Sequence, residues 1–245
     1  MTSIEQARNE TGDPAPPPDT RVVFIRHGES QVTVDQIVGG PEGCIGLSEL
    51  GHRQAEALGV RWATGSEPDI DILFSSTMPR AIETAQHVNT ALGLELHQER
   101  ELEEWRPGEA DGLPWKEVVE RWGTDDPDER GPFVPWAPGG ESLRDLHLRA
   151  GRAIDKVIRE HKGKSIMMVV HAGVIDVGFR LLLGLPVDGG FHLWTKNTSV
   201  TEMVLSHPNA QDFGRRTEPQ WRLVRYNDAA HLAGLPEKTE SQNAH

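Results

Sequence analysis

Four apolar residues stand directly before an arginine, a histidine and a glycine in Val22-Val23-Phe24-Ile25-Arg26-His27-Gly28. A similar order recurs in Ile166-Met167-Met168-Val169-Val170-His171-Ala172-Gly173, where five apolar residues precede a histidine. A third short apolar run is Ile72-Leu73-Phe74. Such runs are typical of strands that are buried on both faces, as in a parallel sheet. The sequence therefore predicts a sheet in which these three runs are strands.

Segments between and after these runs carry the apolar spacing of amphipathic helices. We expect one helix to begin after Ser48, which is a suitable N-terminal cap, and a second to begin at Thr77. The clearest periodicity runs from Glu141 to about His161 and predicts a third helix. Strands that alternate with helices along a chain are typical of an α/β fold.

The composition describes an acidic globular chain with the length of one large domain, 245 residues. Lys and Arg number 25 and Asp and Glu number 38, which gives a net charge of −13. Because nucleic-acid and membrane-surface binding both need a positive field facing phosphates, this balance argues against either kind of partner. The single cysteine, Cys44, cannot form a disulfide within the chain, and we expect it to be a buried apolar residue.

Both ends of the chain are polar, and the middle reads as one domain. Residues 1–20 hold four prolines, several acidic residues and almost no apolar ones, so we expect a disordered N-terminal tail. We expect residues 227–245, which are small and polar, to form a loose C-terminal tail. Residues 21–226 then form the domain, with an insertion rich in Pro, Gly and Trp from about residue 105 to residue 140.

Targeting signals are weak throughout the sequence. The N-terminus lacks the basic flank and the apolar core of a signal peptide. No apolar run approaches the roughly 20 residues of a membrane-spanning helix. Together with the single cysteine, these features predict a cytoplasmic protein.

Two histidines occupy matching places in the predicted fold. Of the eleven histidines, only His27 and His171 directly follow an apolar strand and precede a glycine and a helix-compatible segment. Ligands of open α/β sheets bind beyond the carboxyl ends of the strands, where helix N-termini offer free N–H groups to an anion. Arg26 is next to His27, and Arg80 follows the second strand. Because a guanidinium presents a fork of donors that suits a phosphoryl group, these four residues predict a phosphate pocket.

At these residues the chain resembles a known family, the histidine phosphatases, which include the cofactor-dependent phosphoglycerate mutases. The resemblance covers most of residues 21–205 and rests on five motifs in order: R-H-G-E-S at Arg26–Ser30, S-S-x-x-x-R-A-x-x-T-A at Ser75–Ala85, L-x-E at Leu102–Glu104, P-G-G-E-S at Pro138–Ser142 and H-A-G at His171–Gly173. R-H-G alone is a weak signal, whereas five motifs at these separations are specific. The resemblance implies a three-layer α/β/α fold, with a mostly parallel central sheet and helices on both faces.

The resemblance also implies a role for each residue of the predicted pocket. His27 would be the nucleophile that attacks a phosphomonoester and forms a transient phosphohistidine. Arg26, Arg80 and His171 would bind the phosphoryl oxygens and offset the charge of the transition state. The reaction would release phosphate from a small phosphorylated molecule, which makes the chain a phosphatase.

The general acid and base would be Glu104. The L-x-E register selects it over its neighbours Glu101 and Glu103, and it would protonate the leaving alcohol and then activate water. The resemblance implies neither a metal ion nor a cofactor, because arginines and a histidine supply the positive charge. One position departs from the family pattern, which often has an asparagine six residues after the nucleophile. Here the position is Thr33, and either its hydroxyl donates to the phosphate in place of the asparagine or the loop makes different contacts.

Two alternatives to a phosphatase are a cofactor-dependent phosphoglycerate mutase and a non-catalytic module that binds phosphorylated ligands. Such mutases carry a Trp-Asn pair and then a G-W-x-D loop after R-H-G-x-S. This chain has Gln31-Val32-Thr33-Val34 and Gly39-Gly40-Pro41-Glu42-Gly43 at the corresponding places. A binding module would most simply have lost the nucleophile or the acid, and both are present. These differences favour a phosphatase.

Four tryptophans gather in the insertion, which should cover the pocket: Trp105, Trp115, Trp122 and Trp136. One interpretation is a small satellite core under a long loop. The other is a lid that selects an apolar or ring-bearing leaving group. The sequence leaves both open.

Overall fold

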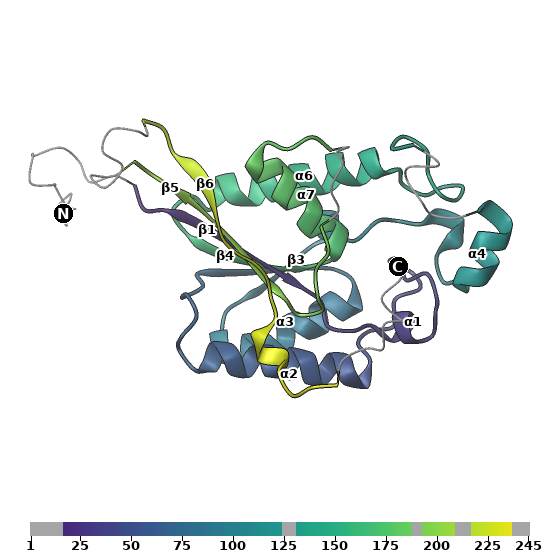
Figure 1. Cartoon of the computed structure of the whole chain (residues 1–245), viewed down its shortest axis with the longest axis horizontal. Coiled ribbons are helices and arrows are strands. Elements are labelled where there is room, and N and C mark those ends of the chain that lie inside the picture. Colours follow the sequence, from purple (N-terminus) through teal and green to yellow (C-terminus); the bar gives the residue numbers. More distant parts are fainter. Residues whose placement is uncertain (1–16, 124–130, 188–192, 209–216, 237–245) are drawn as a thin grey trace, which may run out of the picture.

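The computed structural model describes residues 17–123, 131–187, 193–208 and 217–236, which form three layers, α/β/α (Figure 1). The six strands of the central sheet are β1 Thr20–Arg26, β2 Ile72–Ser76, β3 Leu96–Glu99, β4 Ser165–Val170, β5 Val200–Ser206 and β6 Gln220–Asp228. The helices are α1 Gln31–Val34, α2 Glu49–Ala63, α3 Pro79–Leu92, α4 Trp115–Trp122, α6 Leu143–Glu160 and α7 Ala172–Leu183. The predicted α/β fold with helices on both faces is confirmed.

The strands lie in the order β3-β2-β4-β1-β5-β6. From β3 to β1 all neighbouring strands are parallel, with β4 between β1 and β2. β5 is antiparallel to β1, and β6 is antiparallel to β5. The sheet is thus mixed, which refines the expected mostly parallel sheet. The carboxyl ends of β1, β2 and β4 meet at one edge, and the motif residues follow these three ends.

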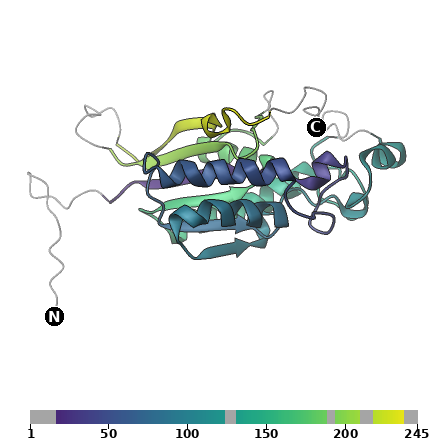
Figure 2. The same ribbon diagram turned by 90° about the horizontal axis from the view of Figure 1, so that it is seen from below.

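Alternate residues of β1 pack on opposite faces of the sheet. Val22 and Phe24 belong to a core cluster that includes α6 and α7. Val23 and Ile25 belong to a second cluster that includes α2 and α3. Figure 1 shows these helix pairs on the two sides of the sheet, and Figure 2 shows α2 and α3 side by side across one face. Burial on both faces explains why the four central residues of β1, 22–25, are all apolar.

The first two long helices begin at local capping signals. Ser48 caps α2 as expected, because its Oγ accepts a hydrogen bond of 3.0 Å from the backbone N–H of Gly51. α3 begins at Pro79 rather than at Thr77. Proline suits the first helical turn, and the Thr77 hydroxyl instead donates to the carboxylate of Glu103 at 2.5 Å.

The third long helix, α6, begins slightly later than predicted. The helix starts at Leu143 rather than Glu141, because Ser142 and Asp145 form a reciprocal capping box. The Ser142 backbone N–H donates to the Asp145 carboxylate at 2.9 Å, and the Asp145 N–H donates to Ser142 Oγ at 3.2 Å. The helix ends at Glu160, close to the expected His161.

The N-terminal boundary lies just before the predicted one. Thr20 is buried as the first residue of β1, where it pairs with Leu205 of β5. The tail predicted over residues 1–20 therefore overlaps the sheet at its last residue. Most of that tail, residues 1–16, lies outside the described residues.

The C-terminal boundary of the domain lies farther from its predicted position than the N-terminal boundary does. β6 continues to Asp228, and a 3₁₀ turn follows at Ala230–Leu232, so the first part of the tail predicted from residue 227 belongs to the folded domain as far as residue 232. An ion pair of 2.5 Å between Asp228 and Arg61 of α2 anchors this segment. Because polar contacts such as this one leave no apolar pattern in the sequence, the composition of the segment resembles that of a tail. Residues 237–245 lie outside the described residues.

The described part of the insertion packs around its own small core. The buried residues of this core are Val38, Ala110, Val118, Trp136 and Ala137, with Trp105, Leu113, Trp115 and Trp122 packed against them. The ring centroids of Trp105 and Trp136 are 5.7 Å apart and stacked, and those of Trp115 and Trp136 are 5.1 Å apart. All four tryptophans therefore belong to a satellite core, and two of them, Trp105 and Trp115, also line the cavity described below.

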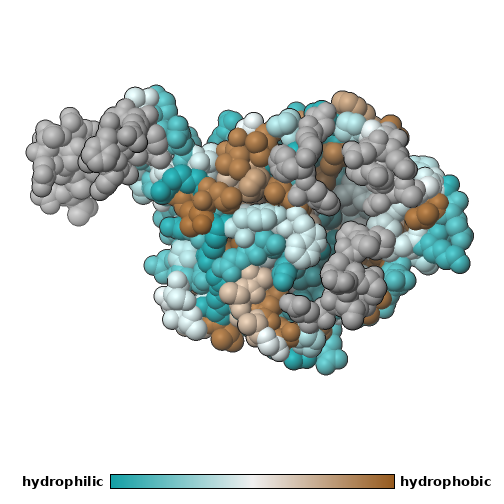
Figure 3. All heavy atoms as spheres, viewed as in Figure 1, coloured by the Kyte–Doolittle hydropathy of each residue, from teal (hydrophilic) through white to brown (hydrophobic). Residues whose placement is uncertain are grey.

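The surface carries both apolar and hydrophilic side chains. Figure 3 shows apolar residues in separate patches among hydrophilic ones on this face. Exposed large apolar side chains include Leu181, Trp194 and Val224, whereas Cys44 is buried as expected. Among the helices described, none has the length and apolar character needed to cross a bilayer.

Candidate active site

The predicted site residues converge at the edge where β1, β2 and β4 end. A cavity of about 940 Å³ opens there, and Arg26, His27, Arg80 and Glu104 line it. His171 is fully buried, and its ring centroid lies 5.0 Å from that of His27. The structure thus brings together the residues that the strand ends and motifs predict.

His27 follows β1 in a conformation that fixes its tautomer. Its Nδ1 lies 2.6 Å from the carbonyl oxygen of Gly28. Because a carbonyl oxygen only accepts hydrogen bonds, Nδ1 carries the proton and Nε2 keeps a lone pair. Arg80 Nε donates to this Nε2 at 3.1 Å. The nitrogen available for nucleophilic attack is therefore Nε2.

Arg80 links the two histidines from the first turn of α3. Its Nε lies 3.3 Å from His171 Nδ1, in addition to the contact with His27. Its Nη1 donates to the carbonyl oxygen of Gly39 at 2.8 Å. The side chain is buried. A guanidinium held in this way presents a fixed positive group at the base of the cavity.

Arg26, the last residue of β1, is the second cation of the cavity. Its Nη1 donates to the carbonyl oxygen of Thr195, while its buried Nε has no hydrogen-bond partner among the described residues. Burial lowers the pKa of Arg26 to about 10, with Glu104 acting in the opposite direction and Arg80 adding to the decrease. The guanidinium remains charged at neutral pH, with donor capacity left for an anion.

His171 caps α7 directly after β4 and is neutral. Burial, reinforced by the nearby charges of Arg80, His27 and Arg26, holds its pKa well below the ordinary histidine range. Because its Nδ1 accepts from Arg80, its Nε2 carries the proton and donates to Ser76 Oγ at 2.8 Å. Ser76 thereby fixes the orientation of the imidazole ring.

The structure separates the three neighbouring glutamates. Glu104 points into the cavity, where its Oε2 accepts from the backbone N–H of Gly173 at 3.0 Å and its Oε1 from that of Trp105 at 3.1 Å. Glu103 is buried away from the cavity wall, and Glu101 is half-exposed. A side chain at Gly173 would overlap the Glu104 carboxylate, which explains the glycine there. Of the three glutamates, only Glu104 lines the cavity.

Thr33 lies on α1 at the cavity wall. The residue is exposed, and its Oγ1 is 2.8 Å from Ser30 Oγ. The hydroxyl is therefore already hydrogen-bonded within the loop that follows His27. A role for Thr33 in phosphate binding remains a prediction.

Positive charge at the site comes from side chains and backbone N–H groups. Within the described ranges, no group of three or more His, Cys, Asp and Glu side chains is placed to hold a metal ion. The residues that line the cavity carry two guanidinium groups, the imidazole of His27, an ammonium group on Lys196, and two carboxylates, those of Glu104 and Glu141. The buried imidazole of His171 lies directly beside His27. This set can bind a tetrahedral anion and transfer protons.

The sequence profile of the histidine phosphatase superfamily (branch 1) matches residues 22–228. The chain belongs to the histidine phosphatase superfamily. The profile covers both histidines, both arginines and Glu104. The family assignment inferred from the five motifs is thus confirmed.

Several members of the superfamily are similar to this chain over most of its length. A metal-independent phosphoserine phosphatase of Arabidopsis thaliana is 32% identical over 225 residues, which cover 88% of this chain and 84% of the relative. A 2,3-bisphosphoglycerate-dependent phosphoglycerate mutase of Brucella anthropi is 30% identical over 172 residues, covering 67% and 82%. A solved mycobacterial glucosyl-3-phosphoglycerate phosphatase matches with a TM-score of 0.66 at 26% identity, covering 85% of this chain and 99% of that one. The chain spans 50% of the length of other curated relatives, from mycobacteria.

Sequence reasoning missed several groups around this cavity. Asn197 Nδ2 donates to the carbonyl oxygen of His27 at 2.9 Å, and Thr195 supplies the acceptor for Arg26. These residues precede β5, and only the pairing of β5 with β1 brings them to the site. Ala229, Ala230 and residues 232–236 also line the cavity. Ser76 could have been found, because it lies within the S-S-x-x-x-R motif.

Proposed function

We propose that the protein hydrolyses small phosphomonoesters, with His27 as nucleophile and Glu104 as general acid and base. The observation that carries this proposal is the tautomer of His27, whose unprotonated Nε2 faces Arg80 in a cavity that Glu104 also lines. A neutral imidazole is nucleophilic near neutral pH. Similarity to two phosphatases supports the same reaction type.

In the first step, the lone pair of His27 Nε2 attacks phosphorus, and the bond from phosphorus to the leaving oxygen breaks. The leaving oxygen takes a proton from the carboxyl group of Glu104 and departs as an alcohol. Nδ1–H stays hydrogen-bonded to Gly28, which stabilises the positive ring. Arg26 and Arg80 offset the charge on the phosphoryl oxygens.

In the second step, the Glu104 carboxylate takes a proton from water, and the water oxygen attacks phosphorus. The bond between phosphorus and Nε2 breaks, which releases inorganic phosphate and restores neutral His27. The bound dianion also favours proton uptake at His171 Nδ1, which then donates to a phosphoryl oxygen. Nε2–H of His171 stays on Ser76, so the ring keeps its orientation.

The experiment is a screen of phosphorylated metabolites that includes 3-phosphoglycerate and its bisphosphate, with phosphate release and isomerisation measured separately. We expect phosphate release by the natural protein, none by His27→Ala, and an acid-labile phosphoryl group on the natural protein after rapid quenching. Turnover retained in His27→Ala would refute the mechanism. Isomerisation without phosphate release would favour the mutase, and binding without either reaction would favour a phospho-ligand module.

A further inference from the structure

Arg149, buried on α6, is tied to the segment that carries Glu104 although 45 residues separate the two in sequence. A guanidinium has five N–H donors, and all five of Arg149 are engaged. Nη1 donates to the carbonyl oxygens of Glu101 at 2.9 Å and Glu103 at 3.0 Å, and Nη2 donates to that of Glu104 at 3.1 Å. Nε and Nη2 bind the two carboxylate oxygens of Glu141 at 2.6 and 2.7 Å.

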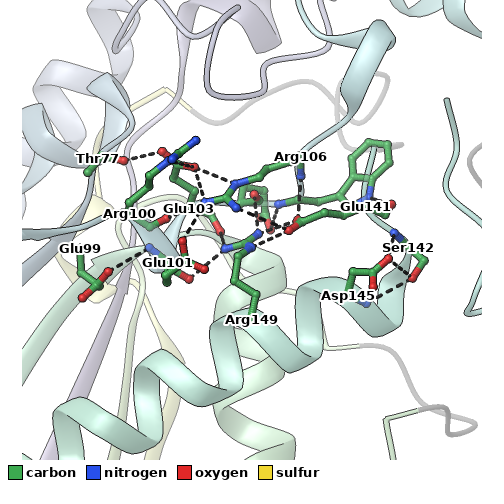
Figure 4. Close-up of polar contacts among 12 residues, drawn as sticks. Thr77, Glu99, Arg100, Glu101, Glu103, Arg106, Glu141, Ser142, Asp145 and Arg149 are labelled. Carbon is green, nitrogen blue, oxygen red and sulfur yellow. Dashed lines mark hydrogen bonds and ion pairs between the residues drawn. The ribbon is translucent and has the colours of Figure 1, made fainter. Parts of the chain in front are cut away.

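Glu141 binds the other end of the same segment, around Arg106. The contacts of Arg149 and Glu141 with residues 101–106 are called the clamp below. The Glu141 backbone N–H donates to the Arg106 carbonyl oxygen at 2.8 Å, and its Oε2 accepts from the Arg106 N–H at 3.1 Å. Its carbonyl oxygen accepts from the Trp105 indole N–H at 2.5 Å. Figure 4 shows Arg149 reaching from α6 toward Glu141 and the Glu101–Arg106 segment. The segment is therefore held from residue 101 to residue 106.

The side chain of Glu103 is fixed on the same segment by other partners. Its Oε1 accepts from the Thr77 hydroxyl at 2.5 Å, and its Oε2 accepts from Arg106 Nε at 3.0 Å. With the backbone clamped by Arg149, Glu104 is left to point into the cavity. There its carboxylate meets the N–H of Gly173 at the start of α7. The clamp determines which of two adjacent glutamates reaches the site.

We propose that Arg149 is a positioning residue that holds Glu104 at the leaving-group oxygen, and that Glu141 supports it by binding its guanidinium. The inference rests on the proposed function, in which Glu104 protonates that oxygen. Arg149 itself does not line the cavity and touches no reacting atom. Its effect should therefore depend on how much the leaving group needs a proton.

The test compares kcat/KM for benzyl phosphate, phenyl phosphate and 4-nitrophenyl phosphate, because kcat/KM reports the steps up to leaving-group departure. Benzyl alcohol needs a proton to leave, whereas 4-nitrophenolate hardly does. Arg149→Met should lower kcat/KM about 100-fold for benzyl phosphate and no more than about 3-fold for 4-nitrophenyl phosphate, since displacing a general acid costs that much. Arg149→Lys, which keeps a cation with fewer donors, should fall between.

Arg180 on α7 offers a matched control. Like Arg149 it is a buried arginine that binds a carboxylate, that of Asp176 at 2.7 Å, and a carbonyl oxygen, that of Pro186 at 2.7 Å. Arg180→Met should leave the ratio of kcat/KM values between the substrates unchanged. If Arg149→Met does not fold, Glu141→Gln keeps the side-chain volume and should still lower the benzyl phosphate value by about 10-fold.

A double-variant cycle separates positioning from general damage. Glu104→Gln should show the same dependence on the leaving group, and adding Arg149→Met to it should cause no further loss for benzyl phosphate. An equal loss on all three substrates, or an additional loss in the double variant, would overturn the role of Arg149. If Glu104→Gln itself lost activity equally on all substrates, the acid of the proposed function would be wrong and the inference would fall with it.

Discussion

Lowering the pH should destabilise the folded protein through His231, in the 3₁₀ turn after β6. Its Nδ1 lies 3.3 Å from Arg61 Nη1, and its Nε2 lies 3.0 Å from Thr198 Oγ1. Because Nδ1 accepts from the guanidinium, the ring is neutral and Nε2–H donates to Thr198. Burial, with Arg61 next in size, lowers the pKa of His231 from 6.5 to about 4, although Asp228 and Glu67 act in the opposite direction.

The direction in which pH changes the unfolding free energy follows from which state, folded or unfolded, binds the proton at His231. As the pH falls below 6.5, His231 of the unfolded chain binds a proton, whereas His231 of the folded chain stays neutral until the pH approaches about 4. The stabilisation is thus fully present above pH 6.5 and is lost progressively toward pH 4. Proton linkage with these two pKa values gives a loss of about 2 kcal/mol between about pH 7.5 and about pH 5. Partial exposure of the ring reduces the expected loss to about 1–2 kcal/mol.

Urea unfolding followed by tryptophan fluorescence at the two pH values measures this loss. The comparison is with His231→Gln, whose amide can accept from Arg61 and donate to Thr198 without titrating. The lowered pKa of buried His171 adds a pH dependence of the same sign, but this contribution is common to both proteins and cancels in the difference. Asp228, whose pKa is lowered to about 2, loses its charge only at lower pH. Equal pH dependence in the natural protein and His231→Gln would refute the reasoning.

Three further outcomes are expected. Asp111 accepts the backbone N–H groups of Gly40, Glu42 and Gly43 at 2.8 to 2.9 Å, beside the Gly39 carbonyl that binds Arg80. Asp111→Asn should therefore raise KM for phosphomonoesters and cost about 1–3 kcal/mol of unfolding free energy in urea. In Gly178→Ala the new Cβ would lie 2.6 Å from Phe24 Cζ, and this overpacking should cost about 1–3 kcal/mol in urea unfolding with activity per folded molecule retained. Phosphatase activity should survive dialysis against EDTA, because guanidinium and imidazole groups supply the positive charge; a strict metal requirement would contradict this.

The fold was predictable because its central strands are buried on both faces. The runs before His27 and His171 become β1 and β4, which are neighbours in the sheet, so two histidines 144 positions apart in the printed sequence meet at one edge. Ser48 and the periodicity from Glu141 likewise carry local signals that mark α2 and α6. Each of these signals is a local pattern that determines secondary structure within a few residues of its own position in the sequence.

Contacts between a side chain and a distant backbone carry no such signal. Arg149 binds three carbonyl oxygens from residues 101–104, and any residue type supplies a carbonyl oxygen. Thr195 likewise serves Arg26 only through its backbone. The segment after residue 227 resembles a tail in composition because the ion pair of Asp228 and the hydrogen bond of His231 with Arg61 of α2 leave no apolar pattern in the sequence. These features follow from the sheet order and from polar geometry, which a pattern of apolar residues does not encode.

The net charge of −13 and the proposed pocket for a dianion are compatible because the charges of the surface and those of the pocket act over different distances. Surface acids are screened by salt within about 10 Å, whereas Arg26 and Arg80 lie in a buried site where charges interact strongly. Burial is the main cause of the lowered pKa of Arg26, the nearby charge of Arg80 lowers it further, and Arg26 Nε has no partner among the described residues. A phosphoryl group would supply both the missing acceptors and the missing negative charge. The site is therefore poised for an anion by its own uncompensated charge, and the acidity of the rest of the chain does not oppose this.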